Sequence, residues 1–121
     1  MKLNQLLTRI DQQIQNTCTR QEKLAWLSEL DGLVKAKILD THVPPVEAQL
    51  PYTTQTPEDT ELLIRPPFDG LYLWWLEARI HYVSGEFIRC NNALDLFQTG
   101  FRDYAAYYNR VYTPCGPSRF T

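Results

Sequence analysis

The sequence has few of the residues that build catalytic loops and metal sites. Of its 121 residues, five are glycine, three are cysteine and two are histidine. The cysteines, Cys18, Cys90 and Cys115, are widely spaced and form no Cys-x-x-Cys pair, which argues against a zinc site or a redox pair. The sequence also contains no Gly-rich phosphate loop, His-Glu-x-x-His or Gly-x-Ser-x-Gly motif. We therefore expect no cofactor, no bound metal and no catalytic activity.

Long apolar runs are also missing. No run approaches the roughly 20 residues of a membrane span. The N-terminal stretch MKLNQLLTRIDQQ has a single lysine and soon becomes polar, unlike a secretory signal. Apolar residues make up 44% of the chain, a share typical of globular proteins. The sequence predicts one domain over residues 1–121, without a membrane partner and located in a cytoplasm.

Basic residues are too few and too unevenly placed for a protein that binds DNA by neutralising phosphates. The formal net charge is −2, and all four lysines lie in the first 37 residues. From Asp40 to Glu61 the chain carries five acids and no lysine or arginine. This segment would repel nucleic acid and could meet a basic protein surface.

What the sequence does have is helical periodicity. Apolar residues recur at helical spacing and predict an all-α fold, a small helical bundle with helices at about 2–15, 20–39, 67–83 and 86–112. Thr19 stands three residues before Glu22, the arrangement of a capping box at the start of the second helix. Gly32, inside that helix, predicts a close contact with a neighbouring element.

The last two predicted helices should form a hairpin or a bent pair. The third is apolar on more than half of its circumference, so we expect it to be the central helix, contacted from two sides. Ser84 and Gly85 permit a break or a bend before the fourth. At 1.5 Å per residue the fourth helix would be roughly 40 Å long, more than the core of so small a domain can cover.

A long proline-rich connection separates the two helical halves. Residues 42–66 contain five of the eight prolines, which forbid a helix through the segment. The segment is longer than the ~12–15 residues at which an unstructured loop becomes unusual. We interpret it either as an arm or loop that becomes ordered against a partner or as a disordered connection.

The fourth helix carries a heptad pattern, called here the seam. Its a and d positions hold, in chain order, Phe87, Cys90, Leu94, Phe97, Phe101, Tyr104, Tyr108 and Val111. Tyrosine and tryptophan are common at protein interfaces, and core packing is the competing use of these rings. The predicted interface residues are Phe87, Leu94, Phe97, Phe101, Tyr104, Tyr107, Tyr108, Tyr112, Trp74, Leu63 and Ile64.

Two polar pairs leave alternatives open. Glu77 and His81 are four residues apart on a helix, so they form either half of a catalytic or metal site or an ordinary surface pair. Asn91 and Asn92 adjoin the seam. Either one of them is buried and fixes the packing register, or one is exposed and the other bonds a neighbouring backbone group.

Several stretches together resemble the head–tail connector (adaptor, neck) proteins of bacteriophages and prophages. They are a WLSELDG helix (Trp26 to Gly32), PFDGLY at a helix start (Pro67 to Tyr72), GEFIRCNN at a bend (Gly85 to Asn92) and YYNRVYTP at the end (Tyr107 to Pro114). The resemblance covers most of the chain. One departure is Cys90, which stands where relatives often have tyrosine.

The resemblance implies a structural protein of the virion neck, assembled in the bacterial cytoplasm. It implies a helical subunit of a ring, commonly a dodecamer, that binds the portal protein and the next neck or tail protein. DNA would pass through the channel of the ring without sequence-specific binding. The alternative is a monomeric, prophage-encoded helical adaptor or regulator that binds one host protein.

Overall fold

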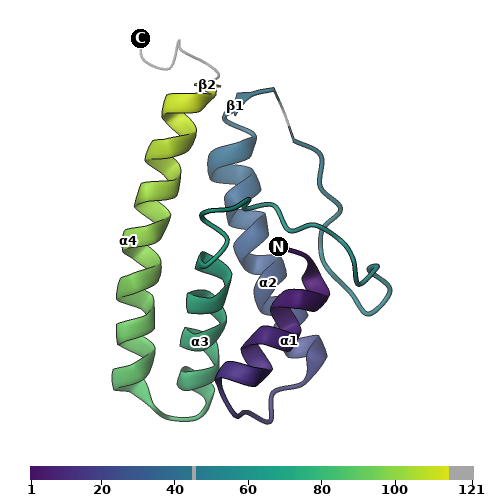
Figure 1. The fold of residues 1–121 in the computed structure, drawn as a ribbon, viewed down its shortest axis with the longest axis vertical. Helices are drawn as coiled ribbons and strands as arrows, with labels where there is room; N and C mark the ends of the chain where they lie inside the picture. The colour runs from purple at the N-terminus through teal and green to yellow at the C-terminus, as the bar shows by residue number, and fades with distance from the viewer. Residues whose placement is uncertain (45, 115–121) are drawn as a thin grey trace.

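The computed structural model describes residues 1–44 and 46–114 (Figure 1). This part of the chain is mostly helical, as predicted, with four α-helices: α1 (Leu3–Gln13), α2 (Arg20–Val34), α3 (Leu71–Val83) and α4 (Phe87–Val111). One turn of π-helix, η1 (Lys35–Leu39), continues α2. Two-residue strands, β1 (His42–Val43) and β2 (Thr113–Pro114), pair antiparallel. None of the helices in these ranges is both long and apolar enough to span a membrane.

The start of α2 is set by the capping box that the sequence predicts. The Glu22 amide donates to Thr19 Oγ1 at 3.1 Å, and the Thr19 amide donates to Glu22 Oε1 at 2.8 Å. Each side chain thus satisfies one of the backbone groups that the first turn of a helix leaves free. The expectation for Gly32 is wrong, because a Cβ atom built there would meet nothing within 4 Å.

Helix α3 is the central helix and contacts α1, α2 and α4 (Figure 1). It forms an antiparallel hairpin with α4, and the chain reverses at Gly85. That glycine has φ +77°, a left-handed conformation that favours glycine. The close contact of the hairpin is at Gly100 of α4, where a Cβ atom would lie 2.7 Å from Leu71 Cδ2.

The connection between the two helical halves packs against its own chain. We call residues 46–66 the connecting segment; it contains no helix. It buries Tyr52, Leu62 and Ile64 in the core. It also covers the start of α1, where the Leu3 amide donates to the Thr60 carbonyl at 2.9 Å. Contacts within the chain therefore account for the placement of this segment.

A buried carboxylate joins the connecting segment to α2 and α3. Asp31 of α2 is fully buried. It accepts hydrogen bonds from the hydroxyls of Tyr52 at 2.5 Å and Tyr72 at 2.7 Å, and from the Leu63 amide at 3.4 Å. The Ile64 amide donates to the Tyr72 hydroxyl at 2.7 Å. These bonds satisfy a group that would otherwise be costly to bury.

The C-terminal end of α4 is tied to the end of η1. Strand β1 pairs with β2, which follows α4 directly. The His42 ring is buried, with Nδ1 at 2.7 Å from the Ile38 carbonyl oxygen and Nε2 at 2.6 Å from Asn109 Oδ1. The ring also packs edge-on against Tyr108, with centroids 4.9 Å apart.

Candidate protein-binding site

Exposed apolar side chains gather where α3 turns into α4. We call Tyr82, Val83, Phe87 and Ile88 the hairpin tip; their exposed fractions are 60%, 56%, 58% and 78%. The rings of Tyr82 and Phe87 contact each other, with centroids 5.6 Å apart. Large apolar side chains at such exposure are ordinary when scattered, but four of them within seven residues, two in ring contact, make this turn a candidate binding surface.

The position of the hairpin tip follows from local geometry. Gly85 reverses the chain, and the Glu86 amide donates to the His81 carbonyl at 2.9 Å, closing the turn. The turn lies at one end of the α3–α4 hairpin (Figure 1), and the four residues of the hairpin tip are within three positions of Gly85 in the sequence. All four of these side chains are more than half exposed.

Charged groups of both signs border the hairpin tip. Arg89 Nη1 lies 3.5 Å from Glu86 Oε1, and both side chains are exposed. Glu86 Oε2 also lies 3.8 Å from Nδ1 of the buried His81. That nitrogen has no hydrogen-bond partner in residues 1–44 and 46–114. An apolar centre with a charged rim is the usual composition of a protein–protein interface.

The middle of the seam faces α3 rather than solvent. The d-position residues Cys90, Phe97 and Tyr104 are buried at 8% exposure or less. Trp75 of α3 contacts the Phe97 ring, with centroids 5.1 Å apart. The seam is exposed mainly at its ends, at Phe87 and at Val111, which is 52% exposed. Most of the heptad pattern is therefore the core side of an intramolecular hairpin.

The predicted interface residues divide into three groups by burial. Phe87 is exposed, and it alone of them belongs to the hairpin tip. Half-buried residues are Leu63, Trp74, Leu94, Phe101, Tyr107 and Tyr112. Core residues of the single chain are Ile64, Phe97, Tyr104 and Tyr108. Those four contribute mainly to packing within the chain, although Tyr104 and Tyr108 also line a pocket.

Sequence reasoning did not select Tyr82, Val83 or Ile88 as surface residues. Tyr82 and Val83 follow the apolar stripes of α3, and Ile88 falls outside the a and d positions. The available signal was an apolar residue next to a predicted turn at Gly85. That signal becomes specific only when the turn is known to be tight.

The polar pairs considered from the sequence behave differently in the structure. Among the described residues, His81 pairs with the carboxylate of Glu86 and not with that of Glu77. Asn91 and Asn92 are both exposed, so neither is buried to fix the register.

Cys18 and Cys90 are free thiols, and Cys115 lies outside the described residues. The described part of the chain holds no group of three or more His, Cys, Asp or Glu side chains that could bind a metal ion.

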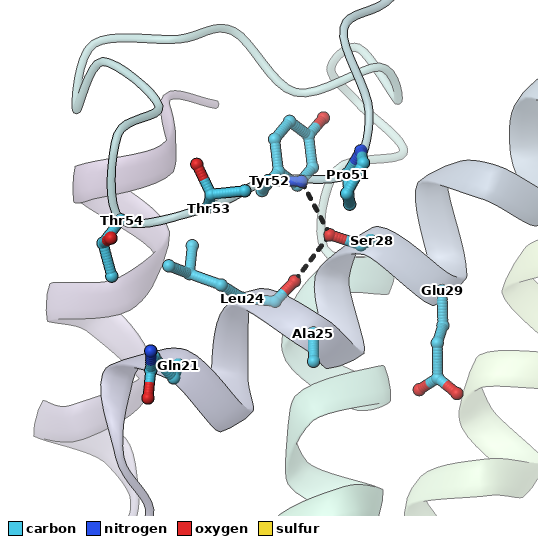
Figure 2. A pocket seen from close by; sticks show the side chains of 9 residues that line it. All are labelled: Gln21, Leu24, Ala25, Ser28, Glu29, Pro51, Tyr52, Thr53 and Thr54. Atoms are coloured by element: carbon cyan, nitrogen blue, oxygen red, sulfur yellow. Dashed lines mark hydrogen bonds between the residues drawn. The ribbon is translucent and has the colours of Figure 1, made fainter.

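An open pocket of about 610 Å³ lies between α2 and the connecting segment (Figure 2). Its lining includes Leu24, Ala25 and Pro51. The Ser28 hydroxyl accepts a hydrogen bond from the Tyr52 amide at 2.8 Å and donates one to the Leu24 carbonyl at 2.8 Å. The Ser28 proton is thus committed to the backbone, and no base contacts it among the residues that line the pocket. In this arrangement Ser28 lacks the neighbouring base that activates a serine nucleophile.

Asp31 is the main residue that sequence reasoning missed. Burial raises the pKa of its carboxyl group, and the hydrogen bonds from Tyr52 and Tyr72 oppose that rise. Its spacing of four residues from Leu27 and three from Val34 placed it on the inner face of α2, which was the available signal. Its role in holding the connecting segment is structural.

Comparison of the chain with known protein families, curated proteins and solved structures finds no match.

Proposed function

We propose that this chain is a structural virion assembly protein of the head–tail connector class, a subunit of a ring that sits on the portal and joins the head to the tail. Four motifs of the sequence resemble that class, and the mostly helical fold agrees with it. The observation that carries the proposal is the hairpin tip, an apolar surface that the single chain leaves uncovered.

The hairpin tip has enough apolar surface to drive association. Burying one large apolar side chain contributes about 1.5–3 kcal/mol relative to leaving it in water. Phe87 and Ile88 are both more than half exposed, so an interface formed over them gains most of that free energy. In a ring, each copy would use this surface against a different surface of the next copy or of the portal, because ring contacts are heterologous.

The test of this proposal is binding to purified portal rings. We expect Phe87→Ser and Ile88→Ser each to reduce co-sedimentation with the portal at least about tenfold, since 1.4 kcal/mol corresponds to a factor of ten. Leu96→Ser is the matched control, because Leu96 is an exposed apolar residue of α4 (51%) outside the hairpin tip, and it should bind normally. If the three variants bind the portal equally well, or if the portal does not retain the wild-type chain, the proposal is wrong.

A second candidate function is a monomeric helical adaptor that binds one host protein. The burial of the seam against α3 favours it, because the single chain covers most of its long helix without a second copy. Light scattering at several concentrations, with and without portal rings, separates the two. A monomer at every concentration that also fails to assemble on the portal supports this second function.

A further inference from the structure

A small aromatic pocket lies at the other end of α4 from the hairpin tip. We call it the tyrosine pocket; it has a volume of about 190 Å³. Its aromatic walls are Phe68, Tyr104, Tyr107, Tyr108 and Tyr112. Between Ile88 and Tyr112, α4 rises by roughly 36 Å at 1.5 Å per residue, so the two surfaces are separate.

The aromatic rings of the pocket are held in place by one another. Phe68 packs against Tyr104 and Tyr107, with centroid distances of 5.5 and 5.0 Å. Tyr108 and Tyr112 stack with centroids 4.3 Å apart and an interplanar angle of 28°. Contacts of this kind fix ring orientation, so the pocket is preformed.

The tyrosine hydroxyls of the pocket are available as hydrogen-bond donors to a ligand. None of the hydroxyls of Tyr104, Tyr107, Tyr108 and Tyr112 has a hydrogen-bond partner within residues 1–44 and 46–114. Tyr104 is only 3% exposed as a whole residue, but its hydroxyl is not a buried unpaired group. Burial raises the pKa of Tyr104 and of Tyr108, so both hydroxyls keep their protons at neutral pH. An acceptor from a ligand would satisfy them.

One charge stands at this pocket. Among the described residues that line it, Arg65 alone is charged, and its side chain is 67% exposed. Glu61 lies 3.5 Å from the Arg65 guanidinium, in an exposed pair of the kind that contributes little. A carboxylate from a ligand can therefore share or replace that contact.

We propose that the tyrosine pocket binds a proline-containing, acidic segment of a partner protein. Proline rings pack well on aromatic side chains, and a polyproline II backbone presents carbonyl groups with no internal partner. The tyrosine hydroxyls supply donors to those carbonyls, and Arg65 pairs with the acidic residue. The small volume means that only a short part of the segment enters the pocket.

Single-stranded nucleic acid is the rival ligand for stacked rings. It requires a basic groove that follows the phosphates. A single arginine in the lining and a formal net charge of −2 do not provide one. The observations therefore favour a peptide.

The test uses the full chain, labelled with ¹⁵N, and a blocked peptide of four prolines followed by two aspartates. We expect amide shifts confined to residues around the pocket and a dissociation constant on the order of 0.1–1 mM, typical of a short peptide with few contacts. Arg65→Glu, a substitution at an exposed side chain, should weaken binding at least about fivefold. It should strengthen binding of the same peptide with two lysines in place of the aspartates. Ile88→Ser, at the hairpin tip, should bind the acidic peptide as the wild type does.

Four results would overturn this inference. The first is no shift at the pocket with the acidic peptide. The second is equal binding of the acidic peptide by the Arg65→Glu variant. The third is that oligothymidylate, but not the peptide, shifts the tyrosine amides. The fourth is that a synthetic peptide of residues 115–121 binds the pocket more tightly than the acidic peptide, which would assign the pocket to a segment of this chain. Loss of portal binding by hairpin-tip variants bears on the proposed function alone.

Discussion

At the scale of single residues, Asp31 has the largest structural consequence. It is an acid on the inner face of a helix, where an apolar residue would be expected. The free-energy cost of burying its carboxyl group is offset by three hydrogen-bond donors from other elements. Two of those donors are tyrosine hydroxyls, and burial beside Asp31 raises the pKa of Tyr52 and of Tyr72. Both tyrosines therefore remain donors across the physiological range.

Asp31 should make stability depend on pH in an unusual direction. Because burial raises the pKa of its carboxyl group in the folded chain above its ordinary value, the folded state holds this proton more tightly than the unfolded state. The stabilising contribution is then complete below the unfolded pKa and is lost as pH rises through the folded pKa. We expect the free energy of unfolding of the wild-type chain, relative to the Asp31→Asn variant, to fall as pH rises from about 4, near the ordinary pKa of an aspartate, toward neutrality.

Urea unfolding of both proteins across that pH range measures this difference. The Asn variant serves as the reference because it lacks the titrating group while other acids are unchanged. A relative stability that rises with pH would mean that the hydrogen bonds from the two tyrosines outweigh burial and that the pKa is lowered.

At the scale of secondary-structure elements, the two glycines inside helices should respond oppositely to alanine. Gly32→Ala adds a methyl group in open space and should raise the free energy of unfolding by up to about 1 kcal/mol through helix propensity. Gly100→Ala places a Cβ atom 2.7 Å from Leu71 Cδ2 and 3.0 Å from Trp74 Cζ3, so it should lower that free energy by about 1–3 kcal/mol. Thermal unfolding of both variants checks the prediction, and a stabilised Gly100→Ala variant would show that α3 and α4 are less closely packed.

The elements themselves were largely predictable from local signals. Apolar periodicity gave four helices, and the capping box gave the start of α2 because its two bonds involve residues three apart. The third helix begins at Leu71 rather than near Pro67, since the residues before it form turns with bonds such as Leu71 amide to Phe68 carbonyl. Boundaries of this kind depend on how the preceding segment packs.

Contacts between distant parts of the chain were not predictable from those signals. The seam is a pattern that fits an intramolecular hairpin and a subunit contact equally well, and only the position of α3 decides that Phe97 and Tyr104 are core. The close approach at Gly100 likewise depends on side chains of another helix. The exposed residues of the hairpin tip can be distinguished from the buried seam residues only in the three-dimensional structure.

At the scale of the whole molecule, the chain has two candidate contact surfaces at opposite ends of one helix. The hairpin tip is apolar with a charged rim, and the tyrosine pocket is aromatic with a single arginine. Their different chemistry predicts different partners. A subunit that must join two other proteins requires such a separation, and a subunit that binds a single protein does not.

The Asp31 hydrogen bonds also have a consequence for amide hydrogen exchange. They bring together residues 31, 52, 63 and 72, which are spread over 41 positions of sequence, and breaking one bond alone would leave the buried carboxyl group with fewer hydrogen-bond partners. The Ile64 amide, whose acceptor is the Tyr72 hydroxyl, should therefore exchange with solvent deuterium only when the whole domain opens. Its protection factor should match that of amides in the middle of α3, although Ile64 belongs to a segment without regular secondary structure.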